Sequence, residues 1–161
     1  MRPAFENKFT EPAMLAARAL GLPQPVVFTN GVFDVLHRGH VTYLAEAAAL
    51  GASLIVALNS DASVKRLGKG DDRPVNTLED RMAVIAALES VSLVTWFDED
   101  TPIARIVEAR PQVLVKGGDW AVDKIVGAPE VQSWGGTVHS IAFQHARSTT
   151  AMLAKIRGTG K

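Results

Sequence analysis

Two histidines in a His-x-Gly-His arrangement are the residues whose chemistry is easiest to infer. His37 and His40 follow a turn at Asn30-Gly31, and Gly39 removes side-chain bulk between them. They stand at the entry of a predicted helix, where free backbone N–H groups and the helix dipole favour an anion. Two imidazole donors at that place can bind phosphate oxygens and stabilise charge that develops during phosphoryl transfer. The arrangement of strand, glycine turn, histidines and helix therefore favours phosphate chemistry.

Two other interpretations of the histidine pair stay open at this point. Both rings can simply cap the helix or pack against it, which is common for a bare His-x-x-His pair. A zinc site is the other alternative, with a third ligand from His139, His145 or a carboxylate. None of these residues stands at a recognisable ligand spacing, so zinc is the weaker alternative.

Two further segments carry groups that suit a phosphorylated ligand. Lys116-Gly-Gly-Asp119-Trp120 follows a predicted strand, and Gly117 and Gly118 let the backbone approach a nucleotide or sugar. We expect the lysine to contact a phosphate, Asp119 to accept hydrogen bonds from sugar hydroxyls, and Trp120 to line the pocket or simply pack. Ser148-Thr149-Thr150 opens the last predicted helix, where the hydroxyls can cap the helix or hold a phosphate.

The remaining charged candidates lie near the first strand and in the polar segment 65–76. Asp34 can cap a loop and hold a neighbouring cation, or contact the substrate directly. Lys65, Arg66 and Lys69 belong to a segment that is too charged for a core and is expected to be a loop. Charged loop residues are usually only solvated, so a ligand role for any of the three is one of two alternatives.

Apolar runs and alanine-rich helical stretches alternate along most of the chain. The predicted strands are 26–29, 53–59, 91–97, 112–116 and 137–143, and the predicted helices are 11–20, 41–50, 77–89, one from residue 100, and 148–157. The strands are continuously apolar, as expected when helices cover both faces. We therefore predict an α/β fold: a doubly wound, five-stranded, mainly parallel sheet flanked by helices. Ligands of such sheets bind beyond the carboxyl ends of the strands, where all the candidates above lie.

Composition narrows the classes of protein. The chain has 161 residues, no cysteine, and 17 basic against 17 acidic residues, for a formal net charge of zero. This predicts one domain, 1–161, with an N-terminal helical extension (1–24) and a core (25–158). Absent cysteine excludes disulfides and cysteine nucleophiles, and the balanced charge argues against nucleic acid. We predict a cytoplasmic protein because the sequence has neither a membrane span nor a secretory signal.

The histidine segment GVFDVLHRGH resembles the motif of the "HIGH"-type nucleotidyltransferase superfamily, which includes cytidylyltransferases and pantetheine-phosphate adenylyltransferases. The similarity continues through VALNSDASVKRL, RPVNTLEDRMAVIAALESV, VLVKGGDW and the closing STT. These blocks look like the D-glycero-β-D-manno-heptose 1-phosphate adenylyltransferase family in its stand-alone form, over residues 26–157. The resemblance implies a Rossmann-like fold and transfer of an adenylyl group from ATP to the sugar phosphate. ADP-heptose supplies the inner core of lipopolysaccharide.

The resemblance also implies roles for particular residues. The catalytic group is His37, His40 and Lys116. The nucleotide is held by Thr29, Asn30, Gly31, Val32, Phe33, Gly39, Arg147, Ser148, Thr149 and Thr150. The sugar phosphate is held by Asp34, Lys65, Arg66, Arg81, Gly117, Gly118, Asp119 and Trp120. Arg81 would hold the phosphate loop or the pyrophosphate. Arg147 departs from the cytidylyltransferase pattern, in which the arginine lies several residues earlier.

No protein-held metal is expected; Mg²⁺ would be bound mainly through the ATP phosphates. The expected partners are ATP and a sugar 1-phosphate, and the resemblance is compatible with a homo-oligomer. Two alternatives for function stay open: another superfamily enzyme, such as a glycerol-phosphate cytidylyltransferase, and a non-catalytic nucleotide-binding module.

Overall fold

The computed structural model describes residues 3–145 and 148–158. Its centre is a sheet of five parallel strands in the order β3-β2-β1-β4-β5. The strands are β1 (Val26–Gly31), β2 (Ser53–Asn59), β3 (Leu93–Phe97), β4 (Val113–Gly117) and β5 (Thr137–Ile141). The predicted α/β sheet is therefore confirmed, with every pairing parallel.

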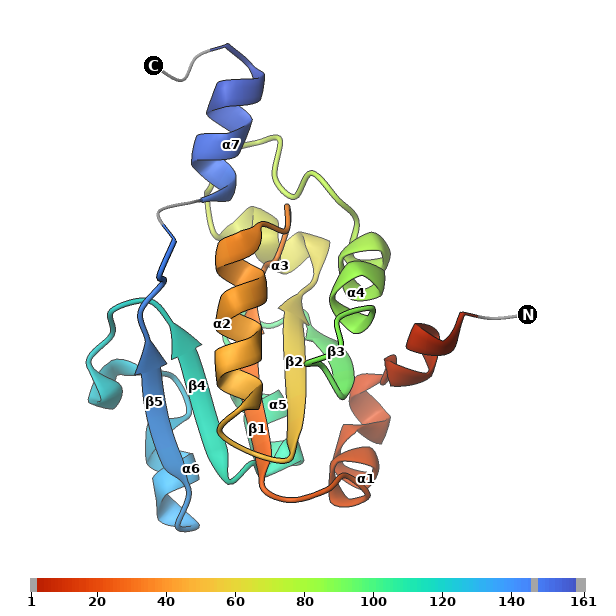
Figure 1. Cartoon of the computed structure of the whole chain (residues 1–161), viewed down its shortest axis with the longest axis vertical. Coiled ribbons are helices and arrows are strands. Elements are labelled where there is room, and N and C mark those ends of the chain that lie inside the picture. The colour runs from red at the N-terminus through yellow and green to blue at the C-terminus, as the bar shows by residue number, and fades with distance from the viewer. Residues whose placement is uncertain (1–2, 146–147, 159–161) are drawn as a thin grey trace.

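Helices cover both faces of this sheet. Figure 1 shows α2 in front of the sheet and α5 and α6 behind it. The α-helices are α1 (Leu15–Leu20), α2 (Arg38–Ala48), α3 (Asp61–Arg66), α4 (Leu78–Ala86), α5 (Ile103–Ala109), α6 (Ala128–Ser133) and α7 (Thr149–Ile156). Short 3₁₀ turns are η1 (Ala4–Lys8), η2 (Pro12–Met14) and η3 (Val122–Lys124). Within the two described ranges, no helix is both long and apolar enough to cross a membrane.

Successive residues of each strand point to opposite faces, so the sheet separates two hydrophobic cores. Val27, Val56 and Leu58 pack under α2 and α4 in one core. Phe28 and Ile55 pack against α1, α5 and α6 in the other. Since both faces are buried, the strands must be apolar throughout, which explains the continuous apolar runs in the sequence.

The N-terminal segment is packed against the edge of the sheet. Phe9 forms an isolated parallel bridge with Val94 of β3, and the Thr10 N–H donates to the Val94 carbonyl at 2.8 Å. Arg18 of α1 donates to the carbonyls of Phe9 and Asn7 and to the Thr10 hydroxyl. These contacts fix the extension onto β3 and cover the outer edge of that strand.

Three local predictions need correction. Lys65 and Arg66 were expected to lie in the loop 65–76 but end α3, and the Ser60 hydroxyl caps the start of that helix by accepting from the Ser63 N–H. Helix α2 begins at Arg38 rather than at residue 41, since His37 itself acts as the N-cap. Helix α6 was not predicted; it has only six residues, and Pro129 in its first turn weakens the helical pattern.

The order of the strands determines where a ligand can bind. The chain moves outward from β1 through β2 to β3 and then returns to β4 on the other side of β1. The connections leave the carboxyl ends of β1 and β4 in opposite directions and open a crevice between them. The segments 30–34 and 116–120 both lie at this crevice, as predicted.

Candidate active site

Three neighbouring cavities open at the carboxyl edge of the sheet. The histidine cavity is about 610 Å³ and is lined by His37, His40, Lys69, Arg73 and residues 148–150, among others. The tryptophan cavity is about 400 Å³, and its lining includes Asn59, Lys69, Lys116, Trp120 and Lys124. A smaller cavity of about 140 Å³, lined in part by His40 and Lys116, shares lining residues with both. Together they form one cleft, with the lysines between its two ends.

The two histidine rings lie against each other at the start of α2. Their centroids are 3.9 Å apart and their planes differ by 23°. The His37 Nδ1 accepts a hydrogen bond from the Gly39 N–H at 3.1 Å, so a neutral ring carries its proton on Nε2. Burial, together with the charge of His37, lowers the pKa of His40 to about 4. Near neutral pH, His40 is therefore an uncharged donor beside a ligand rather than a fixed cation.

His40 presents a polar atom that the protein leaves unsatisfied. Its Nδ1 is buried without a hydrogen-bond partner in the described part of the chain. The edge of its ring packs against Phe33, with centroids 5.3 Å apart. Phe33 has a φ of 48°, in the left-handed region that non-glycine residues seldom adopt. Strained backbone of this kind persists only where the surroundings hold it, and here it positions an aromatic ring against the histidine.

Gly39 is required by the close approach of the histidine ring. A Cβ placed on Gly39 would lie 3.0 Å from both Cε1 and Nδ1 of His37. That distance is shorter than an ordinary van der Waals contact, so a side chain here displaces the ring. The glycine between the histidines thus has a steric explanation.

The hydroxyl residues of α7 face the same cavity. The Ser148 hydroxyl accepts from the Ala151 N–H at 3.1 Å, as the predicted N-cap. The Thr149 hydroxyl donates to the Val35 carbonyl at 3.3 Å and so ties α7 to the segment after β1. The N-termini of α2 and α7 therefore converge on one cavity, which favours an anion there. Arg147, predicted to bind the nucleotide, lies outside the described residues.

Two lysines stand between the cavities. Lys116 ends β4 and is half-buried, and its Nζ has no hydrogen-bond or ion-pair partner within residues 3–145 and 148–158. Burial lowers the pKa of Lys116, and the charge of Lys69 lowers it further. Lys69 lines both larger cavities. An unpaired, partly dehydrated cation beside the histidines suits an anionic ligand.

The other two basic residues of the predicted loop lie elsewhere. Lys65 and Arg66 belong to the last turn of α3 and are exposed, and neither lines the cleft. Arg66 pairs with Asp100 at 2.8 Å and also donates to the Asp98 carbonyl. The predicted contact of Lys65 and Arg66 with substrate therefore needs correction; of the three basic residues, Lys69 is the one in position.

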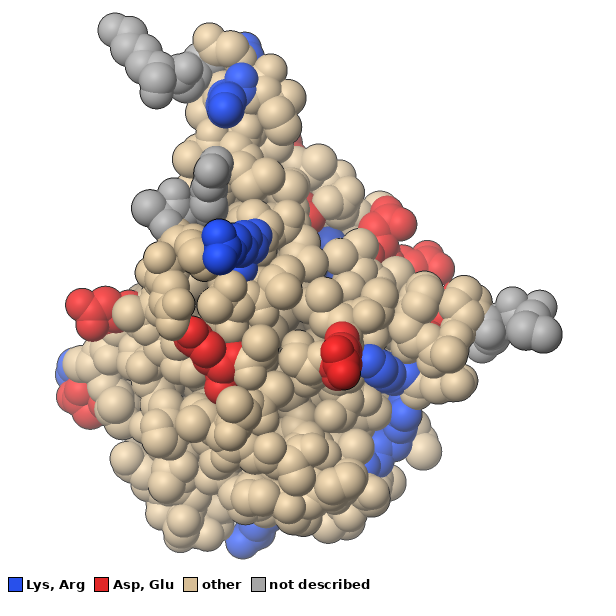
Figure 2. All heavy atoms as spheres, viewed as in Figure 1, with Lys and Arg blue, Asp and Glu red and all other residues tan. Residues whose placement is uncertain are grey.

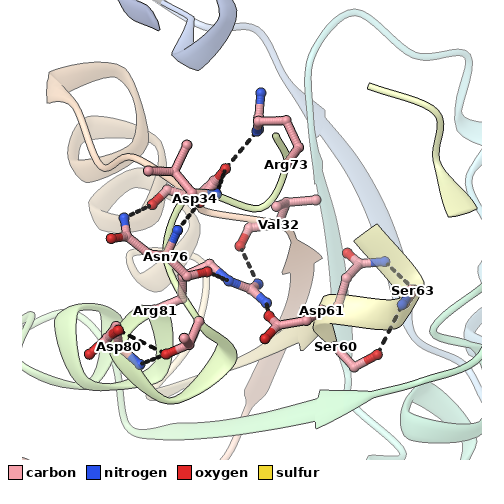
Figure 3. A network of polar contacts seen from close by, with 12 residues as sticks. Val32, Asp34, Ser60, Asp61, Ser63, Arg73, Asn76, Asp80 and Arg81 are labelled. Carbon is pink, nitrogen blue, oxygen red and sulfur yellow. Dashed lines mark hydrogen bonds and ion pairs between the residues drawn. The ribbon is translucent and has the colours of Figure 1, made fainter. Parts of the chain in front are cut away.

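Asp34 and Arg81 hold the site from inside the protein. The fully buried Asp34 carboxylate accepts from the Val75 and Asn76 N–H groups at 2.9 Å and from Arg73 at 2.6 Å. Burial alone raises the pKa of Asp34, but these hydrogen bonds and the Arg73 charge outweigh it, so the pKa lies below its ordinary value. Arg81 is also fully buried and donates to the carbonyls of Asn76 and Val32 and to Asp61 (Figure 3).

For Asp34 and Arg81, these contacts favour the predicted alternative in which each residue holds a loop. Each guanidinium nitrogen of Arg81 already has a protein acceptor. The Asp34 carboxylate is likewise engaged, which favours the loop-holding alternative. Both residues fix the backbone of 32–34 against that of 75–76, so they position the cleft rather than contact a ligand.

The end of β1 is divided between the cleft and the core. Asn30, Gly31 and Val32 line the cleft as predicted. Thr29 does not, because it is fully buried and its hydroxyl is hydrogen-bonded to that of Tyr43 at 2.5 Å. Its predicted nucleotide contact therefore finds no support in this arrangement, in which Thr29 holds α2 against β1. Burial raises the pKa of Tyr43 to about 12, so that phenol stays protonated.

The segment after β4 forms the wall of the tryptophan cavity. Gly118 has a φ of 113°, a conformation that favours glycine, and this turn brings Trp120 back over the strand end. The indole N–H donates to the Gly117 carbonyl at 3.1 Å while half of the side chain stays exposed. Asp119 is exposed and does not line the cleft, so its predicted sugar contact finds no support in this arrangement.

Several lining residues were not singled out from the sequence. Asn59 is the last residue of β2, and its amide donates to Ser63. Lys124, Phe143 and Arg73 also line the cleft. Asn59 and Phe143 end predicted strands, and Arg73 begins the block RPVNTLEDRMAVIAALESV, so a signal was available for these three. Lys124 lies in a segment with no recognisable motif, and only the topology brings it to this edge.

The distribution of charged and metal-ligating side chains bears on what the cleft can bind. On the face shown in Figure 2, basic and acidic side chains are interspersed without a broad patch of either sign. Within residues 3–145 and 148–158, no group of three or more His, Asp or Glu side chains is placed to hold a metal ion. Asp34, which lines the same cavity as the two histidines, is paired with Arg73. A zinc site at the histidine pair therefore lacks a third ligand here.

This cleft, on a doubly wound parallel sheet, is that of a nucleotidyltransferase, and comparison with known families agrees. The chain belongs to the cytidylyltransferase-like family, whose model matches residues 28–158.

Among curated proteins, the chain is 57% identical over 155 residues to the D-beta-D-heptose 1-phosphate adenylyltransferase of Bordetella bronchiseptica, covering 95% of this chain and 96% of that protein. It is 56% identical over 135 residues to the bifunctional protein HldE of Pseudomonas syringae pv. syringae, covering 84% of this chain but 28% of the relative. The resemblance inferred from the sequence motifs is thereby confirmed.

Solved structures agree on the fold. The lipopolysaccharide core biosynthesis protein from Thermoplasma volcanium superposes with a TM-score of 0.61 at 28% identity, over 76% of this chain and 98% of that one. The pantoate-beta-alanine ligase of Francisella tularensis superposes with a TM-score of 0.57 at 11% identity, over 92% of this chain and 76% of that one. The second likeness concerns the fold alone.

Proposed function

We propose that this protein transfers the adenylyl group of ATP to D-glycero-β-D-manno-heptose 1-phosphate, giving ADP-heptose and pyrophosphate. The observation that carries the proposal is the 57% identity to a heptose 1-phosphate adenylyltransferase along nearly the whole of both chains. The cleft supports it because the phosphate-binding groups and a separate sugar-sized cavity adjoin each other. ADP-heptose would then serve lipopolysaccharide core synthesis in the cytoplasm, where ATP is available.

The reaction requires no protein nucleophile and no general base. A phosphate oxygen of the sugar 1-phosphate is already an anion near neutral pH and attacks the α-phosphorus of ATP directly. A bond forms between this oxygen and the α-phosphorus. The bond between the α-phosphorus and the oxygen that bridges the α- and β-phosphates breaks, and its electron pair leaves with pyrophosphate. Catalysis then rests on positioning the reactants and on stabilising charge at the phosphates.

The described residues supply donors for this charge. His37 and His40 would donate to α-phosphate oxygens, and the depressed pKa of His40 keeps it neutral until the anion arrives. Lys116 would stabilise the charge that develops on the transferring group, since its Nζ has no partner among the described residues. The helix start at Ser148–Thr150 would hold the outgoing pyrophosphate.

Mg²⁺ fits this site as a companion of the nucleotide rather than as a resident ion. The side chains around the histidine cavity offer no free carboxylate, because Asp34 is paired with Arg73. When bound, Mg²⁺ would neutralise phosphate charge through oxygens of ATP itself. The protein's contribution is the set of N–H, hydroxyl and ammonium donors around the phosphates.

The sugar would occupy the tryptophan cavity. Its volume of about 400 Å³ suits a monosaccharide, and its lining combines the Trp120 ring with polar side chains such as Asn59. The lysines at the boundary, Lys69 and Lys116, would meet the phosphate that links the two substrates. This assigns the acceptor to one end of the cleft and the nucleotide phosphates to the other.

The proposal is tested by pyrophosphate release with the heptose 1-phosphate and each nucleoside triphosphate in turn. We expect turnover with ATP, and a fall in kcat of about 10²-fold in His40→Ala, the scale for losing one transition-state donor. His139→Ala is the matched control, because His139 lies on β5 outside the cleft. Turnover with CTP and glycerol phosphate instead would indicate a different family member, and binding without turnover would indicate a non-catalytic module.

A further inference from the structure

Arg73 is a buried cation that the mechanism above does not use. It lies between α3 and α4, and its side chain is only 6% exposed. The small exposed part lines the histidine cavity, together with His37, His40 and Thr149. Arginine is seldom buried to this degree unless it is paired.

The pairing of Arg73 is incomplete. Its Nε donates to the Asp34 carboxylate at 2.6 Å. A guanidinium has five N–H donors, and the four on Nη1 and Nη2 have no hydrogen-bond partner within residues 3–145 and 148–158. Figure 3 shows these terminal nitrogens directed away from the network that holds Asp34, Asn76 and Arg81. Asp34 thus fixes the orientation of the arginine while leaving its fork of donors available.

Asp34 itself is held by atoms other than the arginine. The N–H groups of Val75 and Asn76 donate to its carboxylate, and the Asn76 side chain donates to its carbonyl. The carboxylate therefore acts as a rigid support, anchored to backbone on one side and to Arg73 Nε on the other. A side chain held in this way loses little conformational entropy when its remaining donors engage a ligand.

The cavity around the free N–H donors of Arg73 favours an anionic ligand. The cavity receives the N-termini of α2 and α7, and the carboxylate at its lining, Asp34, is already neutralised by the arginine. The planar guanidinium matches two phosphate oxygens bidentately. Resting on the proposed function, we propose that Arg73 binds the polyphosphate of the nucleotide and the pyrophosphate released from it, and that Asp34 is its positioning residue.

A purely structural role makes a different prediction from this one. If Arg73 served only to neutralise Asp34, a lysine in its place would keep the charge and leave the pyrophosphate affinity of the folded protein unchanged. If Arg73 binds phosphate through its fork, Arg73→Lys keeps the fold but loses the bidentate contact. Pyrophosphate affinity therefore separates the two roles.

The experiment is calorimetric titration of the full chain with inorganic pyrophosphate. We expect Arg73→Lys to weaken binding by about 10-fold or more, the scale of losing a hydrogen bond to a charged group. Arg110→Lys is the matched control; that guanidinium lies over the Trp134 ring, before the amino end of β4. Asp34→Asn should weaken pyrophosphate binding as well. Combining it with Arg73→Lys should reduce the binding free energy by less than the sum of the two single effects.

Two further measurements keep the inference open to refutation. The double variant Asp34→Asn/Arg73→Leu removes both charges together, so pyrophosphate binding can be measured in a protein that has no unpaired buried ion. In the unsubstituted protein, pyrophosphate must also shift the NMR signals of a buried guanidinium. Unchanged affinity in a folded Arg73 variant, or no guanidinium shift, overturns the inference. Because the probe is pyrophosphate alone, a protein that fails to make ADP-heptose but shows Arg73-dependent binding refutes the proposed function and retains this one.

Discussion

Replacing Gly39 by alanine tests whether the packing of the His37 ring is needed for the reaction. The added Cβ would lie 3.0 Å from two atoms of the His37 ring, so the ring must move by a few tenths of an ångström. Because the His37 and His40 rings are stacked at 3.9 Å, that movement also disturbs the second histidine. A displacement of about 1 Å can cost 10²-fold in rate, so we expect kcat to fall on the order of 10-fold.

The stability of the fold should change little, which makes the test selective for the site. Gly39 lies in α2, where alanine is a better helix former by about 1 kcal/mol, offsetting the steric cost. The assay is pyrophosphate release under saturating ATP, together with thermal unfolding of the same samples.

Gly21→Ala is the matched control, since the nearest atom to its new Cβ is a carbonyl oxygen at 3.6 Å, an ordinary contact. The reasoning fails if Gly39→Ala folds normally and turns over at the parent's rate. It also fails if Gly21→Ala slows the reaction equally.

Three other predictions follow from buried charge. The pKa of His40 is about 4 in the folded protein, below its ordinary 6.5, so the unfolded chain takes up the proton first as pH falls. The contribution of neutral His40 to the free energy of unfolding is complete above pH 6.5 and is lost toward pH 4. When the pH is lowered from 8 to 5, urea unfolding should show the parent protein losing about 2 kcal/mol more unfolding free energy than His40→Gln. Equal losses in the two proteins would contradict the low pKa. Lys116→Met should lower kcat by about 10²-fold with an unchanged circular dichroism spectrum, and a rate within twofold of the parent would remove Lys116 from the mechanism. Arg81→Met should cost about 3 kcal/mol of unfolding free energy because it breaks a buried polar network, whereas Thr77→Ala, which removes one helix cap, should cost about 1 kcal/mol.

The sheet was predictable because its central strands are rich in apolar residues on both faces and each strand is separated from the next by a helical stretch or a turn. The strand at 53–59 was placed with the bounds that the structure has. Helix α3 escaped prediction because its six residues are half charged, and its stability depends on the Ser60 cap and on Asp61 meeting Arg81. Such short helices are determined by tertiary contacts rather than by periodicity.

The candidate site residues were predictable where a side chain that can bind phosphate follows the end of a predicted strand. The positions of His37, His40 and Lys116 needed only the rule that parallel strands present their carboxyl ends at one edge. The positions of Arg81 and Arg73 needed three-dimensional information. Both are arginines in the same polar region of sequence, yet one has every nitrogen engaged inside the protein and the other leaves its fork at the cavity. Residue type cannot distinguish them, because the difference lies in which acceptors the fold brings within reach.

The sheet also divides the support of the two ends of the cleft. Phe33, which lines the histidine cavity, and α2 rest on the core beneath α2 and α4, while Phe97 and Ile125, which line the tryptophan cavity, belong to the core on the opposite face. Changes in one core should therefore combine additively with changes in the other. The shape of the tryptophan cavity can then diverge, in nature or in the laboratory, by repacking the layer of α1, α5 and α6 without disturbing the layer that holds the histidines. The two faces of the sheet can therefore change independently of each other.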